Sequence, residues 1–571
     1  MASKTGGNAW IVAAIDFGTT YSGYAFSFSG DPLTFYSPGV WYSGQGGMSS
    51  MKTPTCLLLN PNQTFNSFGF KAEELFASLA SEDEHQGYYF FQRFKMDLHF
   101  KNVRKDLYID DVSGKSLSAL KIFSLSIKYL KDHCLKTMKD RGIEPGETEI
   151  KYVLTVPAIW NDRSKKFMRT AAIEAGIKDN RLELALEPEA ASVYCQRVPL
   201  ENLKLGTGKS ITVSGARYLV ADIGGGTADF SVHEVDEDGS LTELYRASGG
   251  PYGGIYVDEK YMKIYDIIFG KGTLEKLRID DMEEYLTILR EFENKKRSIT
   301  PDFQTSFVTK LSAVLNEKRS KEDRLKAIQS SYLRDQVTFV KDKLKIFPTL
   351  MKSFFEDTLG QIIQHVRKIL ETIENIQHIL IVGGYGECSL LQEIFQKEFL
   401  HRNIIIPNEC SLAVIKGAVL FGHNPLAVSS RILRYSYGVA VDPKFNDSEH
   451  PLSNKYIDEE GVARCYDVFS QLISKNTKLP STGLELTKKG HPTTKDKKHY
   501  IVRLYCTEKD NPKIIDENFL PLGRLRISVP EHVKGRWSAE HVFTFGMTEI
   551  KISARVMETG EAVDGTFDLL E

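Results

Sequence analysis

The segment 218–235 carries residue types that together could bind the phosphates of a nucleotide. An apolar run over 218–221 predicts a buried strand, and alternation over 230–235 predicts a half-buried one. The residues between the two strands are Asp222, Gly224, Gly225, Gly226, Thr227 and Asp229. Consecutive glycines let backbone N–H groups approach a ligand closely, and such groups form a concave site for an anion. The two aspartates add oxygen ligands of the kind that Mg²⁺ takes, mostly through water.

The same pattern occurs near the start of the chain. An apolar strand over 11–15 is followed by a turn, and the chain then returns as a second strand over 24–28. The residues of this turn are Asp16, Gly18, Thr19, Thr20 and Tyr21. One such hairpin alone is more often a plain turn, but two copies predict two related lobes that face each other across a nucleotide. A third strand, 378–382, ends in Gly383, Gly384 and Tyr385.

Five short segments, in this order along the chain, resemble the 70-kDa heat-shock chaperones of the actin/hexokinase ATPase superfamily. They are Asp16-Phe-Gly-Thr-Thr-Tyr, Val156-Pro-Ala, Glu187-Pro-Glu-Ala-Ala, Asp222-Ile-Gly-Gly-Gly-Thr-Ala-Asp and Val382-Gly-Gly. The resemblance covers residues from about 10 to 425. The segment Gly249-Gly-Pro-Tyr-Gly-Gly is more similar to the divergent branch called heat shock 70 kDa protein 12A/12B. It implies an α/β fold: a two-lobed, actin-like ATPase domain with duplicated ribonuclease H-like lobes, then a small all-β sandwich.

The chain of 571 residues is long enough for two to four domains. Short alternating segments separated by turns replace helical patterns after about residue 430, which predicts the sandwich. The expected ranges are 10–200 for lobe I, 215–425 for lobe II, 255–376 for a helical subdomain, 411–422 for a crossing helix and 430–571 for the sandwich. Within the last range, 472–480 resembles the peptide-binding sandwich of the chaperones.

The resemblance implies ATP or ADP with Mg²⁺ as ligands, and it assigns residues to the phosphate half of the site. The implied phosphate-loop residues are Gly18, Thr19, Thr20, Tyr21, Gly224, Gly225, Gly226, Gly249 and Gly250. The implied catalytic residues are Asp16, Glu187, Asp222 and Thr227, and the implied metal ligands are Asp16, Asp222 and Asp229. A cation that stabilises charge on the γ-phosphate comes from Arg93 or Lys95, between which the register does not decide. The structural alternative for Arg93 and Lys95 is an ordinary surface cation. For Glu187 it is a carboxylate that caps the N-terminus of a helix.

The other half of the site concerns the base and ribose. Glu293, Lys296 and Thr300 stand at i, i+3 and i+7, which places them on one face of a helix. The resemblance implies that this face binds the adenosine together with Gly383, Gly384 and Tyr385. Without the resemblance, a solvent-facing i,i+3 ion pair is the more ordinary interpretation.

Three features depart from the family pattern. Glu387 stands near the place of the arginine that stacks on adenine, and a carboxylate cannot make a cation–π contact. The segment 427–434 is basic, where the chaperones have an acidic, leucine-rich linker. The sequence given stops directly after its last expected strand, so no helical lid is expected over a bound peptide, and peptide release is expected to be fast.

Composition narrows the classes of function. A formal net charge of -2 and a pI of about 6.7 indicate no nucleic-acid partner. No run is long enough for a transmembrane segment, and the N-terminus lacks a signal-peptide pattern. Seven scattered cysteines show neither metal spacing nor a disulfide framework, and Cys388 and Cys410 are expected to be buried thiols. These features favour a cytoplasmic protein.

The function that the sequence favours is an ATP-binding, chaperone-like protein with slow ATP hydrolysis. Hydrolysis would be coupled to lobe closure and to binding of an extended peptide or a protein partner by the sandwich. The alternative is a nucleotide-gated scaffold or signalling adaptor with little or no turnover. A sugar kinase is disfavoured because no sugar-binding aspartate motif is found in the first lobe, and a filament former because the β-domain hinders close stacking.

Overall fold

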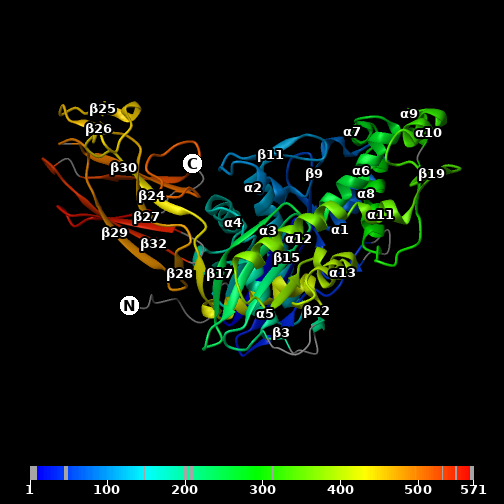
Figure 1. Ribbon diagram of the computed structural model, residues 1–571, viewed down its shortest axis with the longest axis horizontal. Coiled ribbons are helices and arrows are strands. Elements are labelled where there is room, and N and C mark those ends of the chain that lie inside the picture. Colours follow the sequence, from blue (N-terminus) through cyan, green and yellow to red (C-terminus); the bar gives the residue numbers. More distant parts are fainter. Residues whose placement is uncertain are drawn as a thin grey trace.

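A computed structural model describes residues 9–43, 49–146, 148–198, 203–205, 211–311, 313–495, 497–529, 532–546 and 550–565. Parts of the predicted domain ranges, namely 44–48, 147, 199–200, 312, 496, 530–531, 547–549 and 566–571, therefore lie outside the described residues. Figure 1 shows a body of mixed helices and sheets, with the C-terminal strands set to one side and a group of helices at the opposite end.

The first large sheet is built around a fully buried strand, β1 (Ile11–Phe17). The sheet order is β13 (Leu182–Leu186), β12 (Ile150–Val156), β1, β2 (Tyr21–Phe28) and β3 (Asp31–Tyr36), with β6 (Thr53–Pro54) also on β2. Strand β1 is parallel to β12 and antiparallel to β2. Helices α3 (Ala119–Asp140) and α14 (Ala413–His423) pack on β1, which explains why its sequence is apolar apart from Asp16 rather than alternating.

The second large sheet repeats this arrangement around β15 (Arg217–Ile223), which is parallel to β21 and antiparallel to β16. The sheet order is β14 (Leu203–Leu205), β22 (Asn403–Pro407), β21 (His378–Val382), β15, β16 (Ala228–Val235), β17 (Leu241–Gly250), β23 (Val428–Ile432) and β28 (Lys478–Pro480). In both sheets a hairpin therefore adjoins two strands that run parallel to its first strand.

Two helices that were predicted from periodicity are present with small shifts. Apolar residues at helical spacing over 117–138 predict one helix, which is α3, and the helical pattern over 161–175 predicts another, which is α4 (Asp162–Glu174). Asn161 caps α4 because its side chain accepts the Ser164 N–H, and Gly176 ends the helical segment with φ of 85°.

The region predicted to be mostly helical, 255–376, also contains a three-stranded sheet that the sequence analysis missed. Its strands are β18 (Phe307–Lys310), β20 (Lys343–Ile346) and β19 (Val337–Val340). Each has four residues, which is too short for a clear period of two. The helices are α6 (Ile255–Phe269), α7 (Thr273–Asp280), α8 (Met282–Lys296), α9 (Ala313–Lys318), α10 (Lys321–Gln329), α11 (Pro348–Ser353) and α12 (Glu356–Thr372).

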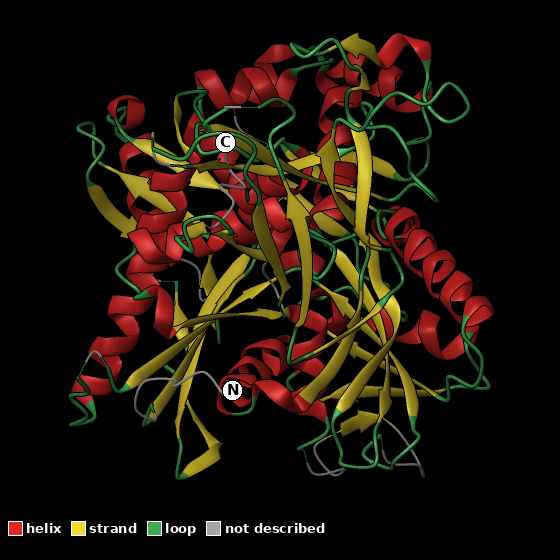
Figure 2. Ribbon diagram, turned by 90° about the vertical axis from the view of Figure 1, so that its left-hand side faces the viewer, coloured by secondary structure: helices red, strands yellow, loops and turns green. Residues whose placement is uncertain are grey.

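After β23 the described chain forms two four-stranded antiparallel sheets. One contains β27 (Val468–Ile473), β24 (Ser436–Val441), β30 (His499–Thr507) and β31 (Leu520–Ser528), and the other β29 (Leu484–Gly490), β32 (Ala539–Phe545), β33 (Ile550–Val556) and β34 (Ala562–Gly565). Side chains of both sheets share one hydrophobic core, including Leu504 and Phe543. Alternating segments predicted strands over 437–441, 466–470, 499–505, 523–529 and 549–555, so strands β29, β32 and β34 were not predicted. Figure 2 views the molecule from the side of these strands.

The basic segment expected to be a linker is instead a strand of the second sheet. Strand β23 pairs with β17 on one edge and with β28 on the other. Arg431 forms a buried ion pair with Glu189, at 2.5 Å between Nη2 and Oε2. Arg434 donates from Nη1 to the Ile159 carbonyl at 2.8 Å. The basic residues of this segment therefore fasten the C-terminal strands to the body of the molecule.

The two large sheets are joined through helices α5 (Glu187–Cys195) and α14, which pack closely. A Cβ added at Gly417 of α14 would lie 1.7 Å from the Ala190 carbonyl oxygen of α5. Backbone cannot move aside as a side-chain end can, so this crossing requires glycine.

We expect Gly417→Ala to lower the free energy of unfolding by about 1–3 kcal/mol through overpacking. Within the described chain, a Cβ at Gly360 of α12 would meet no heavy atom within 4 Å. Gly360→Ala is therefore the matched control, expected to raise stability by up to about 1 kcal/mol through helix propensity. Urea unfolding of both variants measures the difference, and a Gly417→Ala variant as stable as the wild type would contradict the tight crossing.

Candidate functional site

The turns that follow β1 and β15 face each other across a cavity of about 360 Å³. From the first turn Gly18, Thr19, Thr20 and Tyr21 line it, and from the second Gly224, Gly225, Gly226 and Thr227. A Cβ added at Gly225 would lie 2.3 Å from Thr20 Oγ1, and one at Gly226 would lie 2.6 Å from Thr19 Oγ1. The two turns can approach this closely only because the second has no side chains at these positions.

A third segment packs behind the glycine turn. The N–H groups of Gly253, Gly254 and Ile255 donate to the carbonyls of Gly226, Gly224 and Gly225, at 3.2, 3.2 and 2.9 Å. These three bonds hold the turn from the side of α6. Gly254 lines the cavity.

Gly249 and Gly250 were expected in a loop over the phosphates, and this expectation of a loop is wrong. Both lie in β17, where they pair with Asp229 and Ala228 of β16. A Cβ at Gly249 would lie 2.0 Å from the Ala228 carbonyl oxygen, so the glycine serves strand packing. The lining of the cavity includes Gly254 of the same glycine-rich segment instead.

The structure separates the two cations between which the sequence did not decide. Lys95 lines the cavity, is 3% exposed, and its Nζ lies 2.8 Å from Glu187 Oε1. Arg93 instead pairs with Asp258, at 2.6 Å between Nη2 and Oδ2, and lines neighbouring hollows. The geometry therefore favours Lys95 as the cation of the site.

Four buried carboxyl groups lie near the two turns and Lys95, and their surroundings differ: Asp16, Glu187, Asp222 and Asp229. Burial raises the pKa of Glu187 to about 7, although Lys95 beside it acts in the opposite direction. Burial, together with Glu187, Asp229 and Asp16, raises the pKa of Asp222 well above its usual range. For Asp16, burial acts to raise the pKa, but Lys52 outweighs it and holds the pKa below the ordinary value.

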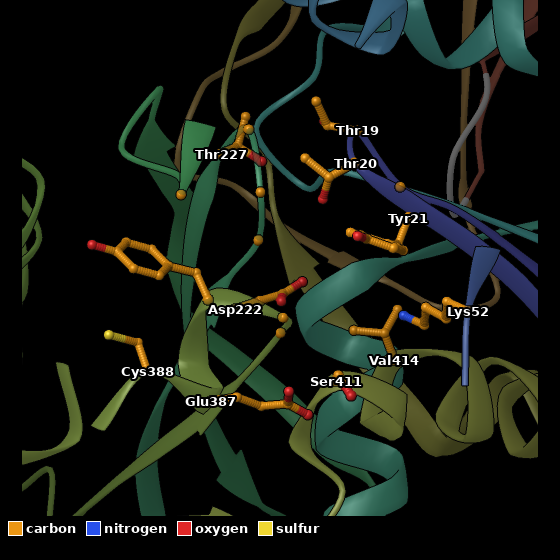
Figure 3. A pocket seen from close by; sticks show the side chains of 18 of the residues that line it. Thr19, Thr20, Tyr21, Lys52, Asp222, Thr227, Glu387, Cys388, Ser411 and Val414 are labelled. Carbon is orange, nitrogen blue, oxygen red and sulfur yellow. The ribbon is translucent and has the colours of Figure 1, made fainter. Parts of the chain in front are cut away.

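The three predicted metal ligands do not converge on one point. Asp16 accepts from Thr155 Oγ1 at 2.8 Å and from Lys52 Nζ at 2.5 Å, so both of its oxygens are engaged. Asp229 is turned away, and its Oδ1 accepts the Ile159 N–H at 3.0 Å. Asp16 and Asp222 both line the cavity, and Figure 3 shows the Asp222 side chain directed into this space. In the part of the chain that the structure describes, no group of three or more His, Cys, Asp or Glu residues is arranged to hold a metal ion. These side chains therefore do not fit a directly coordinated Mg²⁺.

At the other end of the cavity, helix α8 contributes Glu293 and Lys296, whose side chains pair at 2.6 Å. Thr300 was expected on the same helix face, but α8 ends at Lys296. Thr300 lies beyond the helix and its hydroxyl donates to Asp302. The expectation for Thr300 is wrong because it extended the helical period of 3.6 residues beyond Lys296, where α8 ends.

Arg297 was missed by the sequence analysis, although it follows Lys296 directly. Its guanidinium lies 4.7 Å from the centre of the Tyr21 ring and pairs with Glu293 at 2.8 Å. Arg297 therefore links the first turn to α8 across the cavity mouth, and its spacing of four residues from Glu293 is the signal that could have revealed it.

The segment after β21 completes the wall. Gly383 has φ of 89°, and a Cβ there would lie 2.5 Å from Asp222 Oδ1. Tyr385 is buried and its hydroxyl pairs with Thr358 Oγ1 at 2.9 Å, so it supports the wall through packing. Further lining residues that were not predicted are Lys52, Phe355, Ser411 and Val414. Glu387 extends along the floor of the cavity near Ser411 (Figure 3).

Two glycine-containing turns that face each other across a cavity, each after a strand whose second-last residue is an aspartate, define the class of the actin-like ATPase domains. A family model described as Hsp70 protein matches residues 90–428, which is more than half of the chain. The chain is 32% identical to heat shock 70 kDa protein 12A of Mus musculus and 31% identical to heat shock 70 kDa protein 12B of Homo sapiens. Each alignment covers 98% of this chain and 91% of the relative.

Chaperone protein DnaK 3 of Synechococcus sp. is 24% identical over 75% of this chain and 57% of its own length. The chain therefore belongs to the Hsp70 family. Within that family it falls in the divergent branch of heat shock 70 kDa proteins 12A and 12B, as its sequence motifs indicated. Its ATPase domain implies nucleotide binding. Across the described residues, no helix combines the length and the apolar character needed to span a membrane.

The position of Glu387 leads to a prediction for the base end of the cavity. We expect Glu387→Arg to tighten ATP binding about twofold to thirtyfold, because a guanidinium over a purine ring contributes about 0.5–2 kcal/mol. Titration of a fluorescent ATP analogue measures the change. Glu387→Gln removes only the charge and serves as the control. An arginine variant that binds no tighter than the glutamine variant would show that the base does not lie beside residue 387.

Proposed function

We propose that this protein binds ATP or ADP between two duplicated, ribonuclease H-like lobes and hydrolyses ATP slowly. The proposed ranges are 10–200 for lobe I and 215–425 for lobe II, with the helical subdomain at 255–376 and the crossing helix at 411–422. The observation that carries the proposal is the opposition of the two glycine turns across one cavity that also holds Lys95 and buried carboxylates.

The chemistry follows from the charges around the cavity. The phosphates would lie against the backbone of residues 18–21 and 224–226, where small side chains permit close approach. Lys95 would stabilise negative charge that develops on the transferring phosphoryl group. Glu187 and Asp222 would orient the attacking water, with Thr227 beside them. The pKa of Glu187, raised to about 7 by burial, suits a group that accepts and returns a proton near neutral pH.

The base and ribose would lie at the opposite end of the cavity, against Glu293, Lys296 and Arg297 on one side and Gly383 and Gly384 on the other. Tyr385 would shape this pocket by packing. Mg²⁺ would then associate with the nucleotide rather than with a ready cage of carboxylates, since Asp16 and Asp229 are engaged elsewhere.

The C-terminal part, 430–571, would act as a β-sandwich that binds an extended peptide or a protein partner. Its two sheets share a core and include edge strands that can pair with an added strand. Because β23 belongs to the second large sheet, closure of the lobes would be transmitted directly to this part. We place the protein in the cytoplasm, in line with its seven free thiols.

A second candidate is a nucleotide-gated scaffold or signalling adaptor with little turnover. The pairing of Asp16 with Lys52 favours it, because this carboxylate is then less available to position water. Glu387 favours it as well, because a carboxylate beside the base would weaken the grip on ATP.

Asp222→Asn separates these candidates. If the protein is an ATPase, we expect the variant to bind ATP within a few-fold of wild type while its single-turnover hydrolysis falls about 10²–10³-fold, the size of effect seen when one transition-state contact is removed. Rapid mixing of excess protein with labelled ATP measures both. Tight binding without turnover by the wild type would favour the scaffold, and a failure to bind any nucleotide would refute both.

The control is Asp111→Asn. Asp111 is also buried and hydrogen-bonded, at 2.8 Å to the Lys115 N–H, but it lies outside the nucleotide cavity. Hydrolysis by this variant should match that of the wild type. An equal loss in both variants would mean that the effect is one of stability rather than chemistry.

A further inference from the structure

Lys52 lies in the phosphate end of the cavity, although neither the motifs nor the spacing of charged residues singled it out. Its Nζ is 2.5 Å from Asp16 Oδ2, and the two side chains are 14% and 7% exposed. Figure 3 shows its ammonium end directed into the cavity from the side opposite to Asp222. A positive charge therefore lies beside Asp16 of β1, in the lining of the cavity to which Asp222 of β15 also belongs.

The backbone fixes this position. Strand β6 pairs with β2 in the register Ser22 to Thr53 and Tyr21 to Pro54, so Lys52 precedes the paired residues directly. The Lys52 N–H donates to Ser50 Oγ at 3.2 Å. Its aliphatic stem crosses β2 at Gly23, where an added Cβ would lie 3.1 Å from Lys52 Cγ. Lys52 is thus held against β2, the strand that follows the first turn.

The ammonium has more bonding capacity than Asp16 uses. A lysine carries three N–H donors and no acceptor, and one donor satisfies Asp16 Oδ2. The group is part of the cavity lining together with Gly18, Thr20 and Lys95. A phosphate held by the first turn would therefore meet the remaining donors of Lys52 on one side and Lys95 on the other.

The same contact explains why the site lacks a converging set of carboxylates for a metal. Asp16, whose free oxygen would face a hydrated ion, gives that oxygen to Lys52. A cation bound directly there would have to displace the ammonium and break a buried ion pair, which is costly once one partner is left alone. The Lys52 ammonium and a directly bound divalent ion would therefore compete for the same Asp16 oxygen, Oδ2.

We propose that Lys52 is a built-in cation of the nucleotide site: its ammonium contacts the terminal phosphates and supplies positive charge that a divalent ion supplies in metal-dependent sites. This inference rests on the proposed nucleotide binding. It identifies a specificity-determining residue, and its consequence is that nucleotide affinity depends little on Mg²⁺.

The test compares equilibrium binding of ATP and of ADP in excess EDTA and in millimolar Mg²⁺. The wild type should lose less than about threefold in affinity on removal of Mg²⁺, which is under 1 kcal/mol. Lys52→Met keeps the length of the side chain without its charge. In EDTA it should bind about tenfold to hundredfold more weakly than the wild type, as expected for a lost hydrogen bond to a charged group. Mg²⁺ should restore much of that loss.

Two further variants keep the result interpretable. Lys52→Met leaves Asp16 buried without its cation, so the double variant Lys52→Met/Asp16→Asn removes both charges and tests binding in a protein without an unpaired carboxylate. It should show the same dependence on Mg²⁺ as the single variant. Lys151→Met is the matched control: Lys151 is a partly buried lysine of β12, paired with Glu183 at 3.0 Å and outside the cavity. It should bind as the wild type does.

The possible outcomes are distinct. If removal of Mg²⁺ weakens nucleotide binding by the wild type more than about thirtyfold, the role of Lys52 is overturned and the proposed function stands. Equal affinities of wild type and both Lys52 variants in EDTA also overturn it, and would leave Lys52 as a structural partner of Asp16. If the wild type binds no nucleotide in either condition, the proposed function fails and the inference fails with it.

Discussion

The close approach of two turns is the constraint on which the rest of the structure depends. Thr19 and Thr20 of the first turn contact the second turn where side chains would collide, so Gly225 and Gly226 fix the distance between the two large sheets. Gly417, where α5 and α14 cross, sets a second close contact between the helices that join the two sheets. These two contacts bring the sheets close together, so the charged side chains that line the space between them lie close to one another.

Charge balance inside this space is the second organising feature. Asp16, Glu187 and Asp222 are buried in its lining and Asp229 is buried behind them, and burying like charges together is unfavourable unless cations or protons compensate. Lys52 and Lys95 each pair with one of these groups. The raised pKa values of Glu187 and Asp222 reflect the charge that the two lysines leave uncompensated, after burial itself. Such a cluster favours any ligand that adds positive charge or donates hydrogen bonds.

Motifs with strong local signals could be predicted from the sequence, and long-range contacts could not. Both hairpins, the strand before Gly383 and helix α4 with its cap were found, because each depends on a few adjacent residues. The position of Thr300 was wrong because periodicity does not show where a helix ends. Lys52 was missed because its role depends on the register between β6 and β2, which no local pattern encodes. The roles of the site residues stay predictions.

Strand β23 has a mechanical consequence. It is hydrogen-bonded along both edges, to β17 and to β28, and Arg431 anchors it to α5. A segment held in this way resists shear, since all of its bonds must break together. The C-terminal strands thus form an arm attached to the second large sheet and displaced to one side of the body (Figure 1). Any rotation of that sheet would sweep the far end of the arm through a longer arc, in proportion to its distance from the axis.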